Sequence, residues 1–153
     1  HSFLTIDFFV PDTGSGIEGF VNLPGWGLNA SPLRYMEMLE KETITIDYKG
    51  MKVRVPDPAR FSVHKLIISQ RRGDMKKTDE TGITKTNKDI IQGIEVMGML
   101  YRRGEIEKVF EIMNGRTKKQ KNLIKKAVSG DKIRGEIRLL LPKNEQKEFY
   151  KRV

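Results

Sequence analysis

Asp7 is the first residue whose surroundings suggest chemistry, because it stands in an apolar run with Ile6, Phe8 and Phe9. An ionised carboxylate among such side chains requires a cation or hydrogen-bond donors nearby. In a strand Asp7 points away from the face of Ile6 and Phe8, so it could join other carboxylates around a divalent metal. The competing interpretation is an exposed aspartate on a half-solvated strand, which is the commoner situation.

Lys65 and Arg72 are seven residues apart, which places them on one face of a helix. Lys65 lies in the largely apolar stretch 63–68, so its ammonium must reach water or an anion. A phosphate would suit both cations. The ordinary alternative is a lysine that lays its aliphatic chain along an amphipathic helix. His64 is expected to be a packed imidazole, since a single further histidine in the chain cannot complete a histidine-based metal site.

Lys88 and Asp89 are a third candidate, a basic–acidic pair in the first turn of a helix expected to begin at Thr86 or Asn87. An aspartate near a helix N-terminus is favoured by the helix dipole, so the pair by itself is generic. The glycine-rich stretch 14–27 does not match a phosphate-binding loop, because its Gly-Ser-Gly lacks the Lys-Ser/Thr continuation. We expect a flexible turn there.

The first third of the chain is predicted to contain the strands that position Asp7. Apolar or alternating runs indicate strands at 3–10 and 19–23 and a hairpin of 43–48 with 51–55 around Lys49-Gly50. Ser31-Pro32 is typical of a helix start and predicts a short helix over 33–41.

The remainder is predicted to be helical. Asp57 is the expected cap of a helix over 59–72, and the polar stretch 73–86 is expected to be a loop. Further helices are expected at 87–103, 105–113, 118–128 and 142–152, whereas 134–141 is ambiguous. Strands followed by helices predict an α+β fold, divided into a sheet with a hairpin at 1–57 and a helical part at 58–153.

The positive charge of the chain is concentrated in its second half. The whole chain carries +9, residues 1–60 carry −2, and residues 116–152 hold thirteen basic against four acidic side chains. A basic region of this kind is typical of phosphate contact, and equally of a solvated helical face.

Composition excludes several classes of protein. Without cysteine, the chain can form no disulfide, thiolate nucleophile or Cys-built metal site. It contains no apolar run long enough for a membrane span and no signal peptide, and we expect a cytoplasmic protein. The chain starts at His1 rather than Met, which suggests a fragment or a processed chain.

The order of these features is more specific than any one of them. The Ile-Asp-Phe-Phe strand is followed by a hairpin and then by Pro58-Ala59-Arg60-Phe61-Ser62-Val63-His64-Lys65-Leu66, with Lys85-Thr86-Asn87-Lys88-Asp89 further on. This arrangement resembles the latter part of a bacterial nucleotidyltransferase-like family of the polymerase-beta superfamily, over roughly residues 4–100. Abortive-infection-type nucleotidyltransferase toxins are similar in pattern.

The resemblance implies a role for each candidate. Asp7 would be the third carboxylate of a Mg²⁺ or Mn²⁺ site and would help to activate the acceptor. Lys65, with Arg72, would contact the phosphates of an NTP, and Lys88 and Asp89 would belong to the last motif, where arginine is more usual than lysine. The partners would be an NTP and a hydroxyl acceptor in RNA, protein or a small molecule.

Besides Lys88, the chain departs from the family pattern to a larger extent in its upstream motifs. The Gly-Ser and Asp-x-Asp motifs that hold the triphosphate and two metal ions are missing, and we expect them upstream of His1. One carboxylate cannot hold two divalent ions, so the chain as given is expected to be inactive alone.

Two other functions stay open on the sequence. The basic helices from Arg116 onward could form a non-catalytic module for RNA or DNA, through Lys118, Lys119, Lys125 and Lys126. The helical end could instead bind a partner protein, for which the sequence offers no specific signal.

Overall fold

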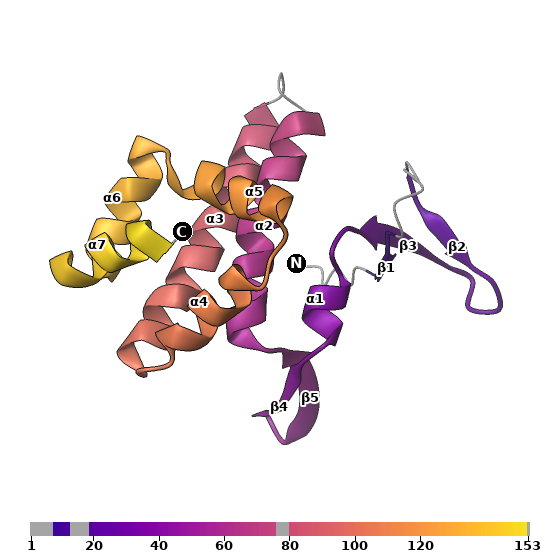
Figure 1. Ribbon diagram of the computed structural model, residues 1–153. Coiled ribbons are helices and arrows are strands. Elements are labelled where there is room, and N and C mark those ends of the chain that lie inside the picture. The colour runs from indigo at the N-terminus through magenta and orange to yellow at the C-terminus, as the bar shows by residue number, and fades with distance from the viewer. Residues whose placement is uncertain (1–7, 13–18, 76–79, 153) are drawn as a thin grey trace, which may run out of the picture.

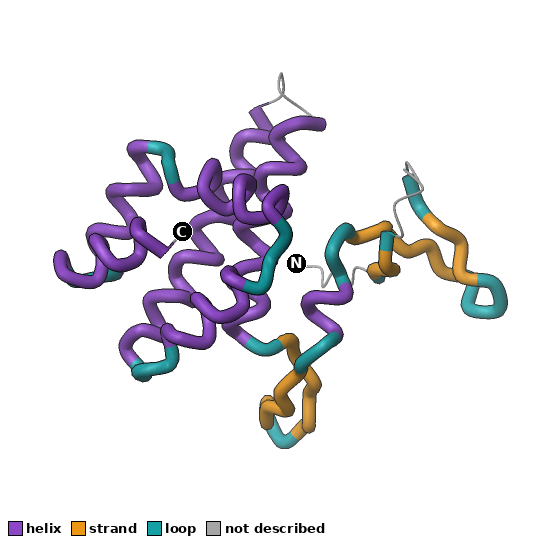
Figure 2. Tube along the Cα trace, in the orientation of Figure 1, coloured by secondary structure: helices purple, strands orange, loops and turns teal. Residues whose placement is uncertain are grey.

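The structure, a computed structural model, describes residues 8–12, 19–75 and 80–152, and for residues 72–75, 80–85 and 131–132 it describes the backbone alone. Strands come first along the chain and helices follow, with the strands to one side of the helices (Figures 1 and 2). The α+β class predicted from the sequence is therefore confirmed.

In the described part of the chain, five short strands form two separate sheets. The first sheet has the order β1-β3-β2, with β1 and β3 parallel and β2 and β3 antiparallel, and the second is the antiparallel hairpin β4–β5. The strand bounds are β1 Phe9–Pro11, β2 Val21–Leu23, β3 Leu28–Leu33, β4 Thr43–Tyr48 and β5 Met51–Pro56. Lys49 and Gly50 both have positive φ in the hairpin turn, as its tight reversal requires.

The helix predicted over 33–41 is wrong in its start and its length. Ser31 and Pro32 lie in β3, opposite Phe9 and Val10 of β1, and the helix α1 spans only Glu37–Glu40. The strand tolerates proline because Phe8 and Asp12, on either side of β1, bond to the backbone of Ser31 and Leu33, whereas β2 pairs only with residues 28–30. Among the described residues, the edge toward which an N–H at position 32 would point has no strand partner, so proline there costs no hydrogen bond of the described sheet.

Six further helices make up the rest of the described chain. Their bounds are α2 Pro58–Met75, α3 Glu80–Arg102, α4 Ile106–Asn114, α5 Lys118–Val128, α6 Asp131–Leu140 and α7 Lys143–Arg152. Asp57 caps α2 as predicted, because its Oδ1 accepts hydrogen bonds from the backbone N–H groups of Ala59 and Arg60. Thr117 caps α5 in a reciprocal capping box with Gln120. The ambiguous segment at 134–141 belongs to α6 except for Leu141, the C-cap that follows its last residue.

The loop predicted over 73–86 is wrong for the described residues. The helix α2 continues to Met75 and α3 already begins at Glu80, so Thr86 and Asn87 are not helix caps. Lysine, arginine, glutamate and methionine are good helix formers, and a polar stretch without apolar periodicity can therefore extend helices that are anchored elsewhere. Figure 1 shows α2 and α3 side by side as a long helical pair.

The core lies between the helices. Val63, Leu66 and Ile67 of α2 pack with Ile90, Ile94 and Met97 of α3, and the cluster extends through α4 and α5 to Phe149 of α7. Met38 of α1 joins this cluster from the first part of the chain. None of the helices within the described ranges is long and apolar enough to cross a membrane.

Candidate functional site

Lys65 and Asp89 form an ion pair between α2 and α3. The Lys65 ammonium donates to Asp89 Oδ1 at 2.7 Å, and the two side chains are 18% and 6% exposed. The same ammonium lies 5.4 Å from the centre of the Phe61 ring, one turn earlier on α2. The sequence singled out both residues but did not predict that they contact each other.

Gly93 allows the two helices to approach closely beside this ion pair. A Cβ at Gly93 would lie 3.0 Å from the carbonyl oxygen of Ser62 and 3.3 Å from Cβ of Lys65. Gly93 follows Asp89 by one helical turn, so the close contact holds the Asp89 carboxylate within reach of Lys65. Asp89 lies nine residues after the first residue of α3 and is therefore not in the first turn. The helix dipole consequently does not explain an aspartate at this position.

The other predicted site residues are less closely grouped. Lys88 precedes Asp89 on α3 and is exposed. Arg72 belongs to α2, two turns after Lys65, and its side chain is outside the described part. Asp7 lies outside the described residues, directly before the segment that enters β1. The structure therefore brings together Lys65 and Asp89 and leaves the grouping of Asp7 and Arg72 untested.

His64 is buried, as expected for a packed imidazole. Its Nε2 lies 3.1 Å from the backbone carbonyl oxygen of Arg34, and Arg71 donates to the Tyr35 hydroxyl at 3.3 Å. Together with the burial of Met38, these contacts fix the segment that follows β3 against α2. The first part of the chain is thereby attached to the helix that carries Lys65.

A charged network at the N-terminal end of α2 was missed from the sequence. Lys108 of α4 donates to Glu42 Oε1 and Asp57 Oδ2, both at 2.9 Å, and Arg60 donates to Glu42 Oε2 at 2.9 Å. These hydrogen bonds lower the pKa of the Glu42 carboxyl below 4.5 and raise the pKa of the Lys108 ammonium above 10.5. Partners up to 66 residues apart leave no local signal in a sequence.

The described residues do not build a metal site by themselves. Within the ranges 8–12, 19–75 and 80–152, no group of three or more His, Asp or Glu side chains is placed to hold a metal ion. Divalent cations require several oxygen ligands, and the Lys65 ammonium already binds the buried carboxylate of Asp89.

Comparisons with known proteins bear on the first 111 residues. A family profile described as nucleotidyltransferase matches residues 1–111, from the strands through α2 and α3 into α4. Searches of curated proteins and of solved structures found no match. The matched part contains Asp7, Lys65, Arg72, Lys88 and Asp89, whereas α5, α6 and α7 follow it.

Proposed function

This chain belongs to a nucleotidyltransferase family, and we propose that it takes part in transferring a nucleotidyl group from an NTP to a hydroxyl acceptor. In that reaction the acceptor oxygen attacks the α-phosphorus, the bond from that phosphorus to the bridging oxygen breaks, and pyrophosphate leaves. The proton of the acceptor hydroxyl passes to a base, the role that we propose for Asp7. RNA, protein and small molecules remain the candidate acceptors, and the cytoplasm, where NTPs are abundant, is the expected compartment.

The family generally uses divalent metals, and we propose Mg²⁺ or Mn²⁺ with Asp7 as one ligand. The metal would supply charge stabilisation at the phosphates.

The Lys65–Asp89 ion pair is the observation that supports a phosphate site on α2 and α3. An ammonium has three N–H donors, and Asp89 takes one of them, which leaves two for phosphate oxygens. Asp89 and the Phe61 ring together fix the ammonium in place, so little side-chain freedom is lost when an anion arrives. We propose Lys65 as the phosphate contact, Asp89 as its positioning residue, and Arg72 and Lys88 as further cations near the same phosphates.

The first test separates phosphate binding by Lys65 from a purely structural ion pair. Lys65→Gln should weaken NTP binding about 10-fold or more, since a charge-assisted hydrogen bond contributes about 1.5–3 kcal/mol. Asp89→Asn leaves the lysine charged and should retain NTP binding within about threefold, because the amide oxygen can still accept from the ammonium. Calorimetric titration with ATP, GTP, CTP and UTP in the presence of Mg²⁺ measures both effects. Lys52→Gln, on the exposed hairpin, is the control for loss of one positive charge.

Transfer itself is tested in a chain that also carries upstream Gly-Ser and Asp-x-Asp motifs. Asp7→Asn should abolish transfer of the nucleotidyl group from an NTP labelled at the α-phosphate. It should leave the affinity of the protein for the nucleotide unchanged. Transfer that survives Asp7→Asn would exclude the role of Asp7. Equal NTP affinity in Lys65→Gln and the unchanged protein would exclude the phosphate site and leave the ion pair as a structural contact.

A further inference from the structure

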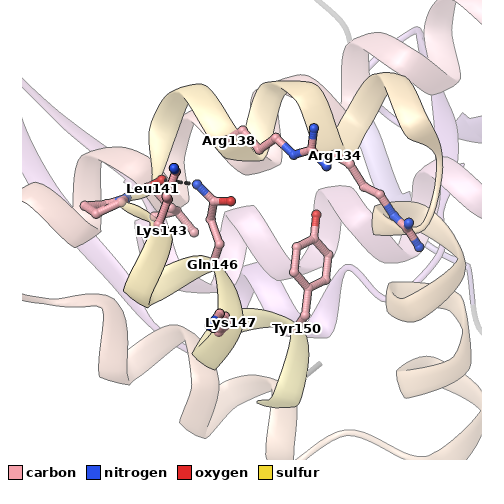
Figure 3. Close-up of a pocket in the computed structure, with 8 residues that line it drawn as sticks. Arg134, Arg138, Leu141, Lys143, Gln146, Lys147 and Tyr150 are labelled. Carbon is pink, nitrogen blue, oxygen red and sulfur yellow. Dashed lines mark hydrogen bonds between the residues drawn. The ribbon is translucent and has the colours of Figure 1, made fainter.

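A cavity of about 910 Å³ lies between α6 and α7, outside the part of the chain that matches the family. Leu141 and Pro142, at the junction of the two helices, contribute its apolar lining. Gln146 Nε2 donates to the backbone carbonyl of Leu141 at 2.7 Å and so fastens the first turn of α7 to this junction (Figure 3). The volume is at the upper end of the range for small-ligand pockets, about 300–1,000 Å³.

Every titratable lining residue that is charged at neutral pH is a cation. Arg134 and Arg138 come from α6, and Lys143 and Lys147 come from α7. In the part of the chain that the structure describes, none of these four side chains forms an ion pair. Cations that line one cavity and form no ion pair among the described residues repel one another, and a bound anion relieves that repulsion.

The cations are spaced regularly on both walls of the cavity. Each helix presents two of them four residues apart, which is about 6 Å along the helix axis. This separation is comparable to that between successive phosphates of an extended nucleic-acid strand.

Tyr150 supplies an aromatic surface in the same cavity. Figure 3 shows its ring rising from α7, with the hydroxyl toward Arg134 and Arg138 of α6. The residue is 40% exposed, and its ring packs edge-on against the buried ring of Phe149 at 5.5 Å. Partial burial raises the pKa of the Tyr150 phenol while Arg134 and Arg138 oppose the rise, so the hydroxyl stays neutral near pH 7.

We propose that the cavity between α6 and α7 binds a short segment of single-stranded nucleic acid, with phosphates on the four cations and a base stacked on Tyr150. Phosphate-tracking cations beside an exposed aromatic ring are the combination with which proteins bind single strands without sequence preference. An acidic peptide would use the cations but would leave the ring without a planar partner. The inference does not depend on nucleotidyl transfer, because it uses none of the residues proposed for that reaction.

The test is the binding of fluorescein-labelled decauridylate and decathymidylate, measured by fluorescence anisotropy at several salt concentrations. For four phosphate contacts, the slope of log K against log salt should be about −3. Arg134→Gln/Arg138→Gln should weaken binding at least about 10-fold and reduce the magnitude of that slope by about 1.4. Tyr150→Leu keeps an apolar side chain without the ring and should weaken binding at least about fivefold.

The matched control removes the same charge from α5. Lys118→Gln/Lys119→Gln lies outside the cavity lining and should change the affinity less than about threefold. Circular dichroism and thermal unfolding of each variant distinguish lost contacts from lost folding, and Lys143→Gln/Lys147→Gln provides a second cavity variant on α7.

Four results would overturn the proposal. They are no binding of either decamer at 50 mM salt, an equal loss of affinity in the α5 control, no effect of Tyr150→Leu, and competition by ATP or tripolyphosphate at the affinity of the decamer. The last result would assign the cavity to a free nucleotide or to an anion without a base.

Discussion

The close approach of α2 to α3 depends on the absence of a side chain at Gly93. Gly135 of α6 is a helical glycine without such a contact and serves as the comparison. A methyl group at Gly93 of α3 would lie 3.0 Å from the backbone oxygen of Ser62, closer than such groups normally approach, whereas Gly135 of α6 faces open space. Both residues are helical, so alanine has the same intrinsic advantage at each. The difference in the free energy of unfolding between alanine at position 93 and alanine at position 135 therefore measures how tight the contact is that holds Asp89 beside Lys65.

Gly93→Ala should lower the free energy of unfolding by up to about 2 kcal/mol, the cost of overpacking less the gain in helix propensity. Gly135→Ala should raise it by about 0.5–1 kcal/mol, because the methyl group meets no atom and the unfolded chain loses freedom. Urea unfolding of both variants gives the two values. Stabilisation by Gly93→Ala would contradict the tight α2–α3 contact.

At the scale of elements, the placement of α7 depends on contacts with α4. Arg152 donates to both carboxylate oxygens of Glu107 at 2.7 and 2.8 Å and stacks 3.9 Å from the Phe110 ring. The bidentate hydrogen bond lowers the pKa of the Glu107 carboxyl below 4.5. This contact fixes the helix that presents Tyr150 and two of the cavity cations.

The protein should lose stability as the pH falls below about 4.5, since a carboxyl with a lowered folded-state pKa stabilises only while it is ionised. Glu42 contributes in the same direction through Lys108 and Arg60. Glu107→Gln should lower Tm at pH 7, and the difference from the unchanged protein should shrink toward pH 3. Thermal unfolding at a series of pH values from 7 to 3 measures this difference in Tm, with Glu95→Gln on the exposed face of α3 as the control. A Tm difference that stays constant with pH would show that ionisation of Glu107 does not contribute to the stability of the fold.

For the whole molecule, burial is uneven. Apart from Ala30 and Met38, the buried apolar side chains of the described residues all follow Asp57 in the sequence. The β4–β5 hairpin exposes Ile44, Tyr48 and Met51, and a two-stranded hairpin is marginal without a covering surface. We therefore propose the division into a strand part at 1–57 and a helical domain at 58–153.

A fragment of residues 57–153, which keeps the Asp57 cap, should retain a helical spectrum and unfold cooperatively. Its Tm should be lower than that of the full chain, because Met38 no longer fills its place in the core. Met38→Ala in the full chain, expected to cost about 2–5 kcal/mol, shows how much of the loss that side chain explains. A gradual, non-cooperative melt of the fragment would contradict an independent helical domain.

The sequence alone determined the features that rest on local chemistry. The Lys49-Gly50 hairpin, the Asp57 cap and the helix at 118–128 were predicted because turn residues, capping residues and apolar periodicity act within a few positions. The order of such features, with the run from Pro58 to Leu66, was also enough to indicate the nucleotidyltransferase family.

Only the tertiary structure decided which distant groups meet. It placed Ser31 and Pro32 in a strand, because pairing with β1 outweighs a local helix-start signal, and it joined Lys65 to Asp89 through the close contact at Gly93. It also set Arg134 and Arg138 opposite Tyr150, on two helices whose sequences suggest nothing but a basic surface. The physical reason is that ion pairs, close helix contacts and cavities depend on distances in space, which short-range sequence patterns do not encode.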